Sequence, residues 1–158
     1  MVELALVLPA LLALALGVAS LTTMYRAQMR ADTAAAETAR MIASDDAATP
    51  DEAAAYARSC VGDDEVRVTL AAPEGGQWAS YAPGTTTGGI GAARRTQTLT
   101  RREAPGAHET SGSAPQSRTV RVTHYAVSVT CERTVDVPVV GSWTASATHV
   151  EEWSVTTL

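Results

Sequence analysis

The chain has 158 residues, a formal net charge of −5 and no phenylalanine. This length leaves room for one domain, and the scarcity of aromatic side chains means that its core must be built mainly from Val, Ala, Leu and Thr. The acidic balance argues against a nucleic-acid partner, because binding to phosphates needs a clustered basic surface.

The N-terminal stretch is a candidate membrane helix. Residues 2–24 read VELALVLPALLALALGVASLTTM, and no polar side chain occurs between Leu4 and Ala19. A soluble amphipathic helix would show one every third or fourth residue. About 20 helical residues cross a hydrocarbon core of roughly 30 Å. We therefore expect a transmembrane segment over residues 1–24, with the helix continuing outside the membrane over residues 25–48.

A secretory signal peptide is the alternative for the same stretch. Gly17-Val18-Ala19 offers small residues for cleavage before Ser20. However, the apolar run has no basic segment ahead of it, and the helical pattern continues past Ser20 as far as Ile42. These features favour an uncleaved membrane helix.

Two residues are unusual in such a helix. Glu3 places a carboxyl group near its start, where it either reaches the lipid headgroups or needs a cationic or hydrogen-bonding partner. Pro9 lacks a backbone N–H and is expected to kink the helix or loosen its first turns.

The N-terminal pattern resembles that of a known family. Val2-Glu3-Leu4-Ala5-Leu6-Val7-Leu8-Pro9, followed by leucines and Gly17, is similar to the start of TadE/TadG-like pseudopilins, the minor pilins of tight-adherence (Tad) type IV pili. The resemblance continues in RAQMRADTAAAETARMIAS, residues 26–44, and returns in SWTASATHVEE, residues 142–152.

The resemblance implies a pilin-like α+β fold and a non-catalytic subunit that helps to prime, assemble or tip the fibre. Its partners would be the membrane bilayer, other pilin and pseudopilin subunits and the pilus assembly machinery. Glu3 would neutralise the N-terminal amine of a neighbouring subunit. In pilin-like proteins this acidic residue is fifth in the mature chain, behind a short basic leader, whereas only Met1 and Val2 precede it here.

The orientation in the membrane follows from two opposing signals. Arg26 and Arg30 follow the apolar run and no Arg precedes it, which by the positive-inside rule favours a cytoplasmic C-terminal domain. A disulfide between Cys60 and Cys131 would instead require an extracytoplasmic domain. A basic leader upstream of Met1 would remove the conflict, and we expect a single-pass protein of the cytoplasmic membrane with an extracytoplasmic head.

The head is expected over residues 49–158 and begins with a short helix. Thr49-Pro50-Asp51-Glu52 places Thr49 as N-cap, Pro50 at the first helical position and Glu52 where it closes a capping box. The predicted helix covers residues 51–59, and Gly62 ends it.

A small antiparallel sheet of three to five strands should follow. Residues 65–71 alternate apolar and polar side chains as a half-buried strand does, and residues 77–81 are expected to pair with them as a hairpin. Residues 118–131 predict a long strand, and residues 143–155 a final one. Between them, about residues 83–117 are rich in Gly, Thr, Ser and Pro and predict a flexible insertion with at most a brief strand over 96–101.

The two cysteines lie far apart in the sequence. A bond between Cys60 and Cys131 would tie the second helix to the sheet, and closing so long a loop is worth roughly 4 kcal/mol. Two unlinked buried thiols are the alternative.

The chain shows no pattern typical of catalysis. The glycine pairs of residues 84–94 lack the Gly-Lys-Ser/Thr of a phosphate loop. His124, His149 and Glu151 lie on predicted strands, where a histidine is more often a surface residue than a metal ligand. We therefore expect no enzyme, cofactor, metal or small-molecule substrate. The alternative function is a membrane-anchored or secreted binding or adhesion module, with residues 84–102 as its contact surface.

Overall fold

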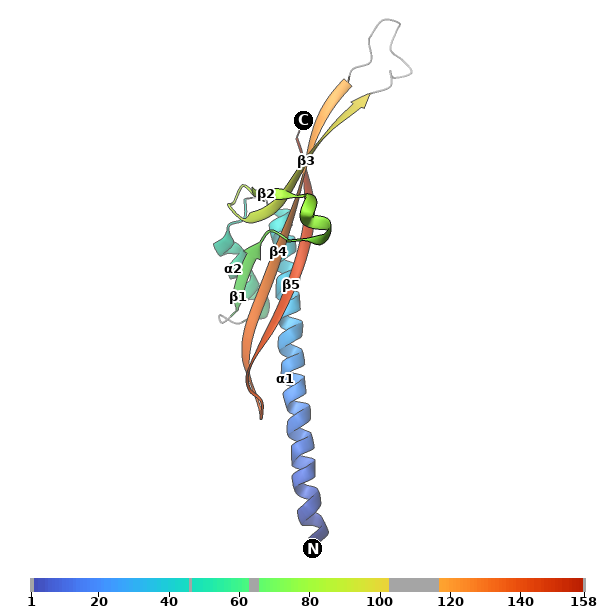
Figure 1. Ribbon diagram of the computed structural model, residues 1–158. Helices are drawn as coiled ribbons and strands as arrows, with labels where there is room; N and C mark the ends of the chain where they lie inside the picture. The colour runs from blue at the N-terminus through green and yellow to red at the C-terminus, as the bar shows by residue number, and fades with distance from the viewer. Residues whose placement is uncertain (1, 46, 63–65, 103–116, 158) are drawn as a thin grey trace, which may run out of the picture.

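The computed structural model describes residues 2–45, 47–62, 66–102 and 117–157, and its architecture confirms the predicted α+β class. A long helix leads into a short second helix and a five-stranded antiparallel sheet (Figure 1). The elements are α1 (Val2–Ser44), α2 (Pro50–Val61), β1 (Arg67–Ala71), the 3-10 helix η1 (Gly76–Ser80), β2 (Ala82–Thr85), β3 (Gly91–Arg102), β4 (Ser117–Val137) and β5 (Gly141–Thr157).

Strand β4 is the centre of the sheet. One of its edges pairs with β5 along residues 121–137. Its other edge pairs with β3 along residues 117–126 and with β1 along residues 128–132, while β2 adds to the outer edge of β3. Both β4 and β5 extend beyond the predicted strands, because the alternating pattern of β4 continues through Val135 and Val137. Every pair is antiparallel, as the alternating patterns predict.

The sheet packs on the C-terminal half of α1 through a face made largely of alanine. Seven residues of this face recur at intervals of three or four, which is the spacing that keeps side chains on one side of a helix. Small side chains let the helix approach the sheet closely, and residues of β4 and β5 fill the other side of the core. On α1 the buried residues are Ala27, Ala31, Ala34, Ala35, Thr38, Ala39 and Ile42, and on the sheet they include Val127, Val129, Cys131, Ala145 and Ala147.

Helix α2 begins as the sequence predicts. The backbone N–H of Glu52 donates to the Thr49 hydroxyl at 3.3 Å, and the Thr49 N–H donates back to the Glu52 carboxylate at 2.9 Å. Both hydrogen bonds of a capping box are therefore present, with Pro50 in the first turn. Gly62 ends the helix in the left-handed conformation, at φ 65°.

The predicted hairpin between residues 65–71 and 77–81 is wrong. Residues 76–80 form the short helix η1, and the edge of β1 pairs with β4. Gly75, with a φ of 76°, and Gly76, the first residue of η1, with a φ of 57°, take the chain out of the extended conformation where η1 begins. The pairing partner of a strand depends on long-range contacts, which a short local pattern does not reveal.

The prediction of a flexible insertion is wrong for residues 83–102. Here β2 and β3 form a hairpin that joins the sheet, and the predicted strand over 96–101 extends from Gly91 to Arg102. Ile90 is fully buried, and Ala92 and Ala93 are buried beside it, so these residues belong to the packed head. The remainder of the predicted insertion, residues 103–116, lies outside the described residues.

Candidate assembly helix and head surface

The N-terminal half of α1 is the most unusual surface of the molecule. From residue 7 to residue 19 every side chain is exposed, although nearly all of them are large and apolar or alanine. Leu14 and Leu21 are 66% and 67% exposed. The helix is long and apolar enough to cross a membrane. Figure 1 shows this half of α1 extending away from the head.

Glu3 and Pro9 both lie within this helix. The helix begins at Val2, so Glu3 is in its first turn, and its side chain lies outside what the structure describes. Helical structure continues without interruption across Pro9, which is exposed. The kink at Pro9 and the pairing role of Glu3 stay predictions.

Two polar contacts fix the head beside α1. The Ser20 hydroxyl shares its one hydrogen between two carbonyl oxygens, that of Leu16, at 2.8 Å, and that of Pro138, in the turn between β4 and β5. Two turns further along, the Gln28 amide donates to the carbonyl oxygen of Ser146 at 2.9 Å. These contacts align β5 with α1, so that the β4–β5 turn points toward the N-terminal end of the helix (Figure 1).

The two cysteines are free thiols in this structure. Cys60 is exposed near the end of α2, and Cys131 is fully buried on β4 opposite Ala147. Burial raises the pKa of the Cys131 thiol to about 11, and the negative charge that Cys60 can carry nearby adds to this shift. The predicted Cys60–Cys131 disulfide stays a prediction.

The two histidines that the structure describes, His124 and His149, do not assemble with acidic residues into a larger cluster. His149 lies 3.2 Å from the Glu151 carboxylate, as their shared strand face predicts. His124 pairs with Ser154 on β5, which is five positions beyond His149, so the two histidines lie apart. Among the described residues, no group of three or more His, Cys, Asp or Glu side chains could hold a metal ion.

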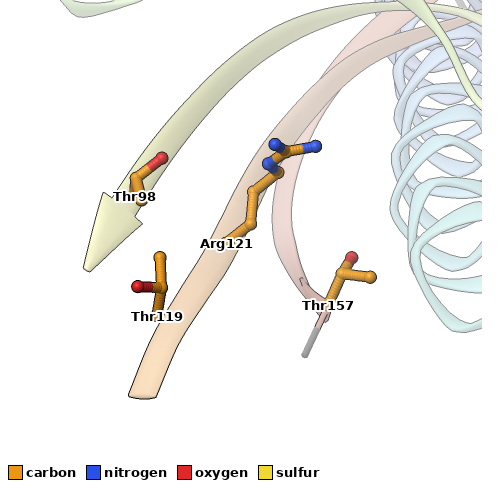
Figure 2. A pocket seen from close by; sticks show the side chains of 4 residues that line it. All are labelled: Thr98, Thr119, Arg121 and Thr157. Atoms are coloured by element: carbon orange, nitrogen blue, oxygen red, sulfur yellow. The ribbon is translucent and has the colours of Figure 1, made fainter. Parts of the chain in front are cut away.

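A shallow hollow of about 270 Å³ lies across the three long strands. Figure 2 shows its lining, which comes from β3, β4 and β5, and the register places Thr98, Arg121 and Thr157 side by side. Thr119 completes it. These side chains offer three hydroxyl groups and one guanidinium, which can attract an anion, but none of the four is a general base at neutral pH.

A comparison with protein families agrees with the resemblance in the N-terminal sequence. A family model described as TadE-like protein matches residues 1–40. Residues 1–40 are therefore similar to TadE-like proteins, and we call them the TadE-like segment. The match covers 40 of the 158 residues. No curated protein and no solved structure matches the chain.

The TadE-like segment ends inside α1, before the head begins. It contains the exposed apolar surface, Glu3 and most of the alanine face that carries the sheet. Sequence reasoning found the helix, but it missed the contact of Ser20 with the Pro138 turn. The signal was present in Val137-Pro138-Val139-Val140-Gly141, an apolar turn between two strands where polar residues are usual.

Proposed function

We propose that this protein is a non-catalytic minor pilin or pseudopilin of a Tad-type type IV pilus. Its N-terminal helix would lie in the cytoplasmic membrane and join the helices of other subunits, and its head would be extracytoplasmic. The TadE-like match over residues 1–40 supports the pilus system, and the apolar helix supports the membrane anchor.

The division of α1 into two halves is the observation that carries this proposal. Between Ala27 and Ile42 one face of the helix is occupied by the protein's own sheet. Between Val7 and Ala19 all sides of the helix are exposed. Exposed apolar side chains around a whole helix require lipid or other apolar helices as their surroundings. Such a helix can therefore lie first in a bilayer and then in a bundle of like helices.

Glu3 would set the position of the subunit in that bundle. A carboxylate in apolar surroundings is costly unless a cation pairs with it, and the N-terminal amine of a neighbouring subunit would supply that cation. In a Glu3→Gln variant, the Gln side chain has nearly the same shape as Glu but carries no charge. Loss of the charge should therefore impair assembly while leaving the helix in the membrane.

A complementation experiment tests the proposal. A deletion strain of the native host would be complemented with the wild-type gene, Glu3→Gln or Glu3→Asp, each at native level, and sheared pili would be quantified. We expect wild type and Glu3→Asp to restore pili and Glu3→Gln to reduce them about tenfold or more, because breaking a charge pair in apolar surroundings costs about 3–5 kcal/mol. Normal assembly with Glu3→Gln would refute the role of Glu3. Normal pili in the deletion strain, with only attachment lost, would instead favour the binding module.

A further inference from the structure

The turn that joins β4 to β5 is apolar, exposed and conformationally costly. Val139 and Val140 are 82% and 59% exposed. Val139 also has a φ of 72°, a left-handed conformation that is a genuine outlier for a β-branched residue. Gly or Asn would occupy that conformation with less strain. The fold alone therefore gives no reason for valine at this position, which points to contacts of the side chain outside the chain.

This turn forms one wall of an apolar groove on the membrane helix. The groove has a volume of about 430 Å³ and lies between Val139 and Val140 on one side and the α1 surface from Ala13 to Met24 on the other. Ser20 supplies a hydroxyl to this lining, and that hydroxyl is occupied by its hydrogen bonds to Leu16 and Pro138. The groove therefore has the chemistry of a site for hydrocarbon.

The position of the turn along α1 places it within the apolar span. Arg26 is the first charged residue after Glu3, and Ser20, which holds the turn, precedes it by six residues. At about 1.5 Å per residue the turn lies about 9 Å on the membrane side of Arg26. On the hairpin itself, Asp136 is exposed and is the last charged residue before the turn. Only the apolar residues after Asp136 would enter the hydrocarbon.

Aromatic side chains lie near the expected membrane boundary. Tyr25 is 66% exposed and precedes Arg26 on α1. Trp143 on β5 lies between the Pro138 contact with Ser20 and the Ser146 contact with Gln28, so it is close to the level of Tyr25. Tyr and Trp are enriched where a membrane protein crosses from hydrocarbon to water.

We infer that the Pro138–Gly141 turn inserts into the leaflet beside α1 and that the groove accommodates a lipid acyl chain. The head is then held at the membrane by two elements, α1 and the turn, and cannot swing freely about the helix. This inference rests on the proposed function only in requiring that α1 spans the membrane. A helix of a second subunit is the other occupant that the groove chemistry allows.

Depth-dependent quenching tests the inference. Val140→Cys would be made in the full chain with Cys60→Ser, labelled with an environment-sensitive fluorophore and placed in nanodiscs of phosphatidylethanolamine and phosphatidylglycerol. Some of the lipids would carry a quencher near the top of the acyl chain. Leu99→Cys, 54% exposed on β3, is the matched aqueous control, and Leu14→Cys is the control for the membrane helix.

We expect the label at residue 140 to show blue-shifted emission and strong quenching, and the label at residue 99 to show neither. Quenching at residue 14 but not at residue 140 would overturn the insertion of the turn and leave the membrane helix in place. Quenching at neither residue would overturn both this inference and the membrane location of α1. If the label at residue 140 becomes shielded only in assembled pili, the groove belongs to a neighbouring subunit and the lipid assignment is wrong.

Discussion

The backbone of Gly88 lies directly against the carbonyl oxygen of Ala48, so that a Cβ atom at residue 88 would stand 1.7 Å from that oxygen. Ala48 belongs to the connection between α1 and α2, and Gly88 belongs to the loop between β2 and β3. The contact therefore joins the C-terminal end of α1 to the outer hairpin of the sheet. A glycine is required here because of this close approach.

The first prediction concerns this contact. Gly88→Ala should destabilise the head by about 2 kcal/mol or more, since overpacking against a backbone atom forces the loop to move. Gly91→Ala is the matched control, because a Cβ there meets nothing within 4 Å. Chemical unfolding of the full chain in nanodiscs, followed by tryptophan fluorescence, measures both. Equal stability of the two variants would mean that the loop does not pack on Ala48.

The second prediction concerns Val139. Val139→Gly should raise the stability of the head by up to about 1 kcal/mol, because relief of the left-handed conformation outweighs the added freedom of the unfolded chain. Gly141→Ala should lower it, since residue 141 has a φ of 87°. The same unfolding measurement applies. A loss of stability in Val139→Gly would show that contacts of the Val139 side chain, with lipid or within the fold, outweigh the strain of its left-handed conformation.

The third prediction concerns the capping box of α2. Hydrogen bonds from the Thr49 backbone and hydroxyl lower the pKa of the Glu52 carboxyl below its ordinary value of 4.5. Because the pKa of Glu52 is lower in the folded protein, its ionised carboxylate stabilises the fold at a pH above the ordinary pKa. This contribution is lost as the pH falls through the lowered pKa of the folded protein. Thr49→Ala should cost about 1 kcal/mol at pH 7. The stability difference between wild type and Glu52→Ala should narrow from pH 7 to pH 3, and an unchanged difference would contradict the charged capping box.

The fourth prediction concerns the thiols. In the reduced, folded protein at pH 8, Cys60 should be alkylated quickly and Cys131 only after unfolding, because Cys131 is buried and its pKa is raised to about 11. Since the unfolded thiol ionises near 9, stability should also fall as the pH rises from about 9 to 11. Mass spectrometry of the alkylated protein measures the labelling, and chemical unfolding measures the change in stability with pH. Rapid labelling of both residues would contradict the packing of β4 on α1.

The same labelling without prior reduction tests the predicted disulfide. Protein isolated from membranes in the presence of an alkylating agent would remain unlabelled at both Cys60 and Cys131 if they are bonded. Labelling of Cys60 in that sample would show two separate thiols. Because a reducing cytoplasm does not sustain such a bond, its presence would also indicate an extracytoplasmic head.

The features that sequence predicted correctly depend on neighbouring residues. The capping box needs only Thr49 and Glu52 at the right spacing, and the long apolar N-terminal helix needs only a long run of apolar residues. The alternation along residues 118–131 likewise predicts a long strand, and β4 (Ser117–Val137) contains all of them. Local chemistry decides these features, so a local pattern reveals them.

The features that sequence missed depend on contacts between distant segments. Gly88 reads as part of a flexible linker, whereas its small size serves a close contact with Ala48 forty residues earlier. Strand β1 pairs with β4 rather than with residues 77–81. Val139 adopts a conformation that propensity assigns to Gly or Asn. In the candidate site, the contact of Ser20 with Pro138 spans 118 positions, so it could be found only once the sheet was placed on α1.

The most direct test of the account is photo-crosslinking from the exposed half of α1 in the native host. A photoreactive amino acid at residue 14 should crosslink, during pilus production, to another Tad pilus subunit or assembly protein identified by mass spectrometry. The same probe at residue 99 on the head serves as the control for a surface outside the membrane. Capture of a pilus component from residue 14 is the predicted result. Crosslinks from residue 14 to lipid alone, in cells that are producing pili, would contradict a role of this helix in assembly.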